Sequence, residues 1–144
     1  MAMDLQIELR QLTKAGKGWL GRKRCQDIAL AVFRRVKAPS DRRVLSVVMV
    51  GPTRMTTLAR RRGKHSATDV LAFSLDAPML GEIFLCPGII TARARDWGRT
   101  PQQHAQALFV HGLLHLLGYD HERQKDAREM EQLERKIVCS KVSK

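Results

Sequence analysis

Three histidines stand close together in the segment His111-Gly-Leu-Leu-His115-Leu-Leu-Gly118-Tyr-Asp-His121. His111 and His115 are four residues apart. On a helix they lie about 40° apart in azimuth and one turn apart in height, so both imidazoles can reach one ion. Gly118 is typical of a helix end, where a left-handed residue turns the chain and lets His121 approach the same point. Three neutral nitrogens with a vacant fourth position describe a catalytic zinc site, and we predict one zinc ion here.

The other two histidines fall outside this predicted site. His104 precedes His111 by seven residues, which is about 10 Å along a helix axis and too far to share an ion bonded to nitrogen at about 2 Å. His65 lies in a basic segment, where contact with solvent or phosphate is expected. Met130 falls in a helical pattern, so we expect it to pack in the core.

The spacing His-x-x-x-His-x-x-Gly-x-x-His is similar to that of the metzincin zinc proteases, with one difference. The general-base glutamate of those proteases would stand at position 112, where this chain has glycine. A metal-dependent peptidase is therefore one alternative function, which Gly112 and the strong positive charge disfavour.

The chain is strongly basic, with 26 Lys and Arg against 14 Asp and Glu and a net charge of +12. The excess lies in residues 1–119, which hold 19 basic and 8 acidic residues; residues 120–144 are nearly balanced, with 7 and 6. Such an excess indicates an anionic partner, with nucleic acid the first candidate. Because only seven residues are aromatic, we expect contact with phosphates rather than stacking of many bases. The alternative is a small basic protein that meets polyanions without specificity.

Apolar periodicity predicts alternating strands and helices, with no repeat and no linker. The sequence of 144 residues is thus expected to form one α/β or α+β domain. Predicted strands cover residues 5–9, 44–50, 69–75 and 82–86. Predicted helices cover residues 20–36, 89–97, 100–118 and 126–138. A further short helix is predicted to start at residues 51–53 and to end at residues 60–64.

The segment Gly16-Lys-Gly-Trp-Leu-Gly21 matches the pattern of a dinucleotide-binding loop. In such a loop the acidic partner ends the second strand, but Asp41 precedes the strand predicted at 44–50. We therefore interpret this segment as a turn that opens a helix.

Cysteine usage and the amino-terminal segment predict a cytoplasmic protein. Cys25, Cys86 and Cys139 are odd in number and widely spaced, which suits a reducing compartment and argues against a thiolate zinc site. Each is expected to be a small buried hydrophobe. The first residues lack a basic stretch followed by an apolar one, and no apolar run is long enough to span a membrane, so no membrane partner is expected.

The three-histidine segment resembles the signature of the YbeY family of bacterial ribosomal-RNA maturation factors, which are zinc-dependent endoribonucleases. Two further stretches are similar: Arg62-Gly-Lys64 leading into Thr68-Asp-Val-Leu-Ala72-Phe, and Leu80-Gly-Glu82-Ile. The resemblance covers about residues 62–130. The chain departs from the family pattern at Ala72, Ser74 and Glu82, where the family has Ser, Pro and Asp.

This resemblance implies a fold and a function. The fold is a mixed, mostly parallel four-stranded sheet flanked by helices, with a metal site on a helix and the turn after it. The activity is metal-dependent, single-strand-specific RNA cleavage in ribosomal RNA maturation and ribosome quality control. The implied partners are a ribosomal RNA precursor and the small ribosomal subunit. A non-catalytic RNA-binding assembly factor with structural zinc is the remaining alternative.

Several residues receive expected roles in that reaction. Arg62 matches the family's functional arginine and can direct two donors onto phosphate oxygens, while His111 is both a ligand and a catalytic residue. Arg60, Arg61 and Lys64 are expected to extend an RNA-binding groove. For Arg60 and Arg61 the alternative is a solvated helix end that suits the helix dipole. Without a glutamate at position 112, proton removal falls to the metal, to Glu82 or to Asp120.

Overall fold

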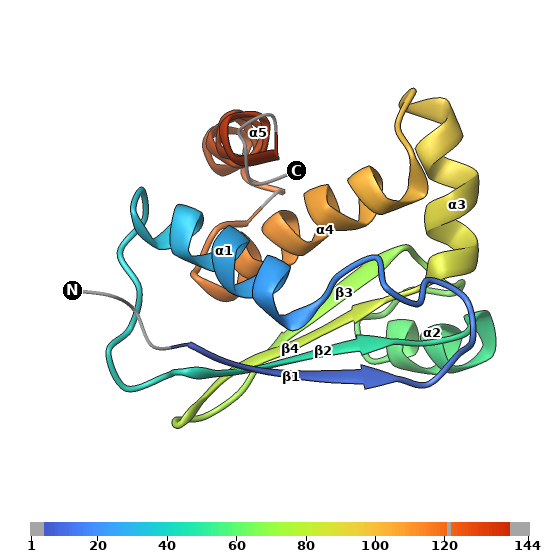
Figure 1. Ribbon diagram of the computed structural model, residues 1–144, viewed down its shortest axis with the longest axis horizontal. Helices are drawn as coiled ribbons and strands as arrows, with labels where there is room; N and C mark the ends of the chain where they lie inside the picture. The colour runs from blue at the N-terminus through green and yellow to red at the C-terminus, as the bar shows by residue number, and fades with distance from the viewer. Residues whose placement is uncertain (1–4, 121, 139–144) are drawn as a thin grey trace.

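The computed structural model describes residues 5–120 and 122–138. Four strands and five helices follow one another along this part of the chain (Figure 1). In chain order they are β1 (Gln6–Gln11), α1 (Arg22–Phe33), β2 (Val44–Met49), α2 (Pro52–Arg60), β3 (Val70–Ser74), β4 (Met79–Leu85), α3 (Pro87–Asp96), α4 (Pro101–Leu116) and α5 (Gln124–Val138).

The strands form one mixed sheet in the order β1-β2-β4-β3. β1, β2 and β4 are parallel, with Ile7 opposite Leu45 and Val47 opposite Ile83. β3 runs antiparallel to β4 and forms one edge of the sheet. The predicted α+β fold with a mostly parallel four-stranded sheet is therefore confirmed.

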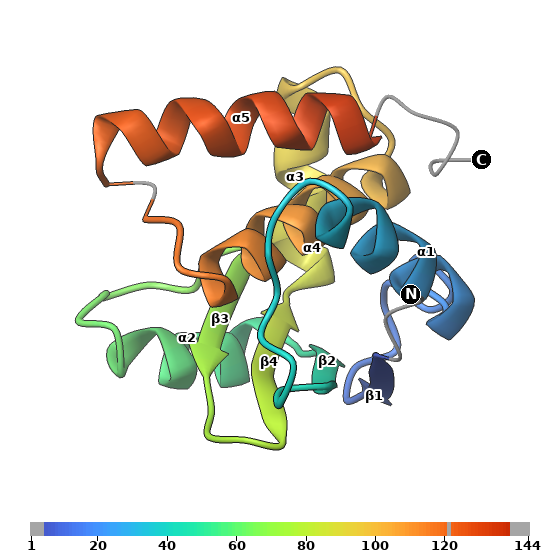
Figure 2. The same ribbon diagram turned by 90° about the vertical axis from the view of Figure 1, so that its left-hand side faces the viewer.

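Helices cover both faces of the sheet, but unequally (Figures 1 and 2). A large core lies between one face and the helices α1, α4 and α5, with Ile28, Phe109 and Met130 fully buried in it. A smaller core on the other face packs α2 against β2, β3 and β4 through Met55 and Phe84. Met130 is thus a core residue, as predicted. Figure 2 shows α5 as an outer layer above α4 and α1.

Helix α4, which carries His111 and His115, is fixed at both ends by its sequence. Thr100 and Gln103 form a reciprocal capping box, and Pro101 occupies the first turn. Just beyond the carboxyl end, Gly118 has φ = +104°, a conformation that favours glycine. In the middle, a Cβ added at Gly112 would lie 3.2 Å from Ile83 Cγ2, so glycine allows α4 to approach β4 closely.

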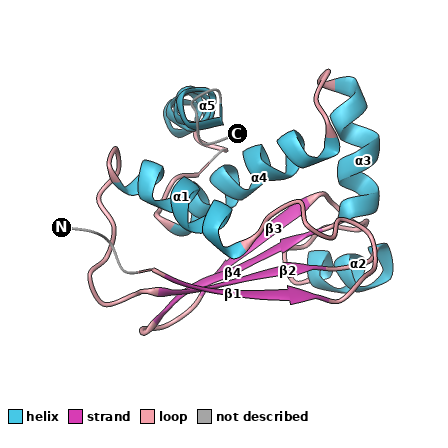
Figure 3. Cartoon of the chain, viewed as in Figure 1, coloured by secondary structure: helices cyan, strands magenta, loops and turns pink. Residues whose placement is uncertain are grey.

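The other sequence-based predictions of structure agree closely with the observed elements (Figure 3). The glycine-rich segment 16–21 is a turn that precedes α1, with positive φ at Gly16 and Gly18. Cys25 and Cys86 are free and buried, and burial raises the pKa of the Cys25 thiol to about 12. Cys139 lies outside the described residues. None of the helices in the described part of the chain has the length and apolarity needed to cross a membrane.

Candidate active site

A cavity of about 610 Å³ opens between α4, β3 and the segment that joins α2 to β3. His111, Gly112 and His115 form its α4 side, and residues 70–72 form its β3 side. Charged side chains complete the lining: Arg62, Lys64, Asp69, Asp120 and Glu122. The basic groups come from the segment after α2, whereas two of the acidic groups follow α4. An anionic ligand and a cation can therefore be held on different sides of one cavity.

The two described histidines of the predicted metal site meet at this cavity. His111 and His115 both line it, one helical turn apart on α4, as their spacing predicts. His121 falls outside the described residues, and within the described ones no group of three His, Cys, Asp or Glu residues could hold a metal. The donor chemistry fits zinc, since imidazole is a preferred ligand and neither Cys25 nor Cys86 lines the cavity.

A carboxylate from α5 faces the first of these histidines. Glu134 Oε1 lies 3.8 Å from His111 Nδ1, and both side chains are about three-quarters buried, at 24% and 27% exposed. At this distance the pair is an electrostatic contact rather than a hydrogen bond, and the carboxylate places a negative charge beside Nδ1 of the His111 ring. Glu134 was missed by the sequence reasoning. The helical period of 124–138 places residue 134 near the buried face that carries Met130 and Ile137, which is the signal that could have drawn attention to it.

Arg62 is held against β3 at the wall of the cavity. Its Nη2 donates a hydrogen bond to the carbonyl oxygen of Ala72, and its guanidinium carbon lies 4.5 Å from the centre of the Phe73 ring. These contacts hold the Arg62 side chain at the cavity wall. Arginine has five N–H donors, and the hydrogen bond to Ala72 uses one of them. All four basic residues of this segment are exposed, but Arg60 and Arg61 do not line the cavity, whereas Arg62 and Lys64 do. The structure therefore separates Arg62 and Lys64 from their two basic neighbours.

The two candidate proton acceptors lie in different places. Ile83 faces α4 at Gly112, and successive residues of a strand point to opposite faces, so Glu82 faces the α2 side of the sheet. Glu82 does not line the cavity, so its place in the sheet adds no support for a role at the histidine site, and that role stays a prediction. Asp120 does line it, and its Oδ1 accepts a hydrogen bond of 2.9 Å from the Glu122 backbone N–H.

A buried polar cluster lies behind the cavity, and Asp69 belongs to both. Asp69 Oδ2 is 3.2 Å from Arg93 Nη1 and 3.7 Å from Nε2 of His104, whose side chain is 5% exposed. On its other side, His104 Nδ1 lies 3.2 Å from Arg99 Nη1. Arginine only donates, so Nδ1 accepts and the proton of the neutral ring is assigned to Nε2. His104 is thus a structural residue rather than a ligand, as its spacing from His111 predicts.

Desolvation by burial lowers the pKa of His104, against the opposing effect of Asp69. Sequence reasoning did not identify Asp69 as a cavity residue, because an acidic residue at the start of a strand carries no periodic signal. Its place beside Arg93 depends on how α3 packs, which follows from the tertiary fold. His65 is exposed in the segment after α2 and does not line the cavity.

Comparisons with known proteins agree with this architecture and cavity. The family model described as Endoribonuclease YbeY matches residues 17–141. The chain belongs to the YbeY family. A relative named Endoribonuclease YbeY from Chromohalobacter salexigens is 38% identical over 146 residues, covering 96% of this chain and 88% of that protein. The Endoribonuclease YbeY of Stenotrophomonas maltophilia strain R551-3 is 42% identical over 88 residues, which span 54% of this chain and 55% of that protein.

A solved structure shows the same fold. The solution structure of TM1509 from Thermotoga maritima superposes with a TM-score of 0.59 at 31% identity, covering 92% of this chain and 87% of that one. The resemblance of this chain to the YbeY family, predicted from residues 62–130, is therefore confirmed over most of its length.

The buried histidine of this YbeY family member predicts a pH dependence of stability. Because its pKa is lowered in the fold, the unfolded chain binds more protons at His104 as the pH falls below about 6.5. The contribution that His104 makes to the unfolding free energy is therefore complete above that pH and is lost below it. Chemical denaturation of metal-free protein between pH 7.5 and 5 should show a smaller loss of unfolding free energy for His104→Gln than for the parent. If the unfolding free energies of His104→Gln and the parent fall by the same amount between pH 7.5 and 5, the lowered pKa of His104 is contradicted.

Proposed function

We propose that this member of the YbeY family is a zinc-dependent endoribonuclease that cleaves single-stranded RNA. We further propose that it acts in the cytoplasm on ribosomal RNA precursors, with the small ribosomal subunit as a partner, in ribosomal RNA maturation and quality control. One observation carries the proposal: His111, His115 and Arg62 line the same cavity in a chain whose relatives are named endoribonucleases. Residue types suited to binding a metal and to binding a phosphate therefore lie in one cavity.

The proposed ligands of the single zinc ion are His111, His115 and His121. Two of them face the cavity from α4, and the Glu134 carboxylate orients the His111 ring from behind. A bound zinc supplies Lewis acidity at a phosphoryl oxygen and lowers the pKa of a bound water.

Arg62 and Lys64 are proposed to bind the phosphate that is attacked. Arg62 is held by Ala72 and Phe73, so its planar group is fixed before the substrate arrives. Donors that are already oriented stabilise the charge that builds up on phosphoryl oxygens without further rearrangement. Arg60 and Arg61 are proposed to contact RNA outside the cavity, since both are exposed on the end of α2 and the turn after it.

Asp120 is the proposed acceptor of the proton that leaves the nucleophile. Its carboxylate lines the cavity and is held by the Glu122 N–H, whereas Asp69 is engaged by Arg93 and Thr68. In the peptidase alternative the proton acceptor would stand at position 112. There α4 packs against Ile83, and the glycine brings no carboxylate. Among the described residues, the position that supplies the proton acceptor in the peptidase alternative therefore has none.

The Glu134 contact predicts a change in zinc affinity. Glu134→Gln keeps the size of the side chain but removes the negative charge behind His111, so zinc affinity should fall by about 10- to 100-fold. Competition with a chromophoric chelator measures this affinity without any substrate. Glu131→Gln is the matched control, because Glu131 lies on the same helix and pairs with Arg135 at 2.6 Å on the surface. Equal zinc affinities for the two variants would contradict the role of Glu134.

A side-by-side assay tests the proposed reaction. One preparation with zinc bound is given a single-stranded RNA, the same RNA as a duplex, and a casein-derived peptide mixture, each with and without a chelator. We expect cleavage of the single-stranded RNA alone, stopped by the chelator. Peptide hydrolysis that exceeds RNA hydrolysis would favour the peptidase alternative. RNA binding without cleavage at one equivalent of zinc would favour the non-catalytic assembly factor.

A further inference from the structure

Trp97, at the carboxyl end of α3, is exposed to an extent that the fold does not explain. Its side chain is 66% exposed, against 42% and 37% for Leu12 and Leu9, the other exposed large hydrophobic residues in the described part of the chain. Tryptophan is usually buried for most of its surface, because its apolar area is costly to leave in water. Single exposed hydrophobic residues are common on protein surfaces, so the groups around the ring decide whether it is suited to a ligand.

The exposed ring stands on a hydrogen-bonded turn and contacts an arginine. The Trp97 and Arg99 backbone N–H groups both donate to the Ala94 carbonyl oxygen, at 3.1 and 2.9 Å, and close a turn at Gly98. The Arg99 guanidinium carbon lies 5.2 Å from the centre of the indole ring, and the same side chain reaches buried His104. Arg99, which also contacts buried His104, therefore lies against one part of the Trp97 ring, and the rest of the ring is exposed to solvent.

The position of the ring relative to the cavity follows from α3. Arg93 and Trp97 are four residues apart and so share one face of the helix, about 6 Å apart along its axis. Arg93 Nη1 pairs at 3.2 Å with Asp69 Oδ2, and Asp69 lines the cavity. Arg93 therefore links the two places, since it pairs with a cavity residue and lies one helical turn from Trp97. Figure 1 shows α3 rising away from the end of the sheet.

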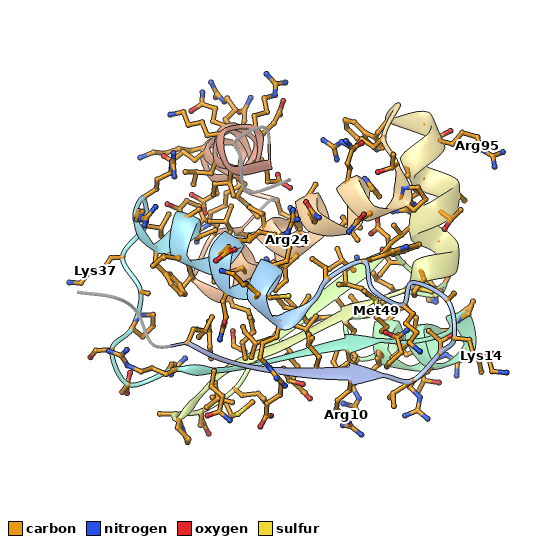
Figure 4. The ribbon with its side chains drawn as sticks, in the orientation of Figure 1. Arg10, Lys14, Arg24, Lys37, Met49 and Arg95 are labelled. Carbon is orange, nitrogen blue, oxygen red and sulfur yellow. The ribbon has the colours of Figure 1, made fainter. Side chains whose placement is uncertain are left out.

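The charge around the ring favours an anionic ligand. Arg93, Arg95 and Arg99 stand within two turns of Trp97, with Asp96 as the only acidic residue between positions 93 and 99. The Arg93 side chain is half exposed, at 50%, although it pairs with Asp69. Arg95 extends from α3 into solvent (Figure 4). A planar apolar ring among arginines matches the two parts of a nucleotide, a base that stacks and a phosphate that is negatively charged.

We propose that Trp97 is a stacking platform for one unpaired base of the RNA strand that enters the cavity, and that Arg93 contacts a phosphate between the two. This proposal rests on the proposed function, because it places a binding subsite on the path of the same substrate. It goes beyond that function by assigning a base contact outside the cavity and by explaining a preference for single strands. Bases in a duplex are already stacked and cannot lie flat on the ring.

The intrinsic fluorescence of the protein gives a direct test. The chain has two tryptophans, and Trp19 is partly buried against the core while Trp97 is exposed. Metal-free protein, which does not cleave, is titrated with a ten-nucleotide oligouridylate, with the same backbone lacking its bases, and with duplex RNA. Only the oligouridylate should quench the emission. Trp19→Phe should retain the quenching and Trp97→Phe should lose most of it.

Affinity measurements separate stacking from charge. Trp97→Ala should weaken oligouridylate binding by about 5- to 100-fold and leave the weak binding of the base-free backbone unchanged. Leu12→Ala, which removes another exposed hydrophobic side chain, is the control and should bind as the parent does. With zinc restored, Trp97→Ala should raise KM for RNA cleavage and leave kcat within about twofold, because the ring lies outside the cavity.

Two outcomes would overturn the proposal. One is a Trp97→Ala variant that binds oligouridylate within twofold of the parent. The other is a parent protein that self-associates through Trp97, seen as a change in sedimentation in the variant without loss of RNA affinity. Failure of the proposed function has a different signature. In that case the quenching and the loss of affinity would persist in a protein that does not cleave RNA with zinc bound.

Discussion

His115→Ala is expected to purify without bound zinc and to show no RNA cleavage above background, a loss of at least about 10³-fold. The reason is geometric. His115 lies one turn from His111 on α4 and faces the same cavity, so removing it leaves fewer ligands than a catalytic zinc site needs. Elemental analysis of protein purified without chelator measures the zinc, and cleavage of a fluorogenic RNA measures the activity.

The matched control for this variant is His65→Ala. His65 is exposed in the segment after α2, outside the cavity, so its loss should change neither zinc content nor cleavage. A thermal unfolding curve of metal-free His115→Ala that overlies that of the metal-free parent shows that the fold is kept. If His115→Ala retains one equivalent of zinc, the metal lies elsewhere and the cavity has another role.

Arg62→Ala is expected to lower kcat for RNA cleavage by about 10²- to 10³-fold while zinc content stays at one equivalent. Arg62 is fixed at the cavity wall by Ala72 and Phe73, and we propose that it acts on the phosphate rather than on the ion. Arg62→Lys should recover little of the loss, because an ammonium group cannot offer two parallel donors or stack on the ring in the same way.

Arg60→Ala and Arg61→Ala remove the same charge next to Arg62 and serve as its controls. Both side chains are exposed and do not line the cavity, so their effect should be confined to KM and should shrink at high salt. If either variant lowers kcat as much as Arg62→Ala does, the basic segment acts only through its charge and the assigned role of Arg62 is wrong.

The elements of this fold follow from local signals that a single sequence carries well. Thr100, Pro101 and Gln103 mark the start of α4, and Gly118 marks its end, because caps and left-handed glycines act within a few residues. The helical spacing of His111 and His115 was predictable for the same reason. The mixed, mostly parallel sheet was implied by the family resemblance rather than by periodicity. The strand order β1-β2-β4-β3 was not predicted, since pairing partners are far apart in the sequence.

The parts of the site that could not be predicted depend on contacts between distant elements. Glu134 lies near His111 only because α5 packs against α4. Asp69 pairs with Arg93 only because α3, which begins directly after β4, places Arg93 next to the start of β3. The place of Glu82 depends on the tertiary fold in the same way. Glu82 became a candidate through a matching motif, and the alternation of side chains along β4 turns it to the face opposite the one where Ile83 meets Gly112.

The most direct test of the proposed activity titrates zinc and cleavage together. Metal-free protein receives zinc in steps from zero to three equivalents, and at each step bound zinc and the initial rate of single-stranded RNA cleavage are measured on the same sample. We predict that the rate rises in proportion to bound zinc and stops rising at one equivalent, and that His115→Ala shows neither binding nor rate. Full RNA cleavage at zero zinc, or a zinc-loaded protein that leaves RNA intact, would contradict a zinc-dependent endoribonuclease.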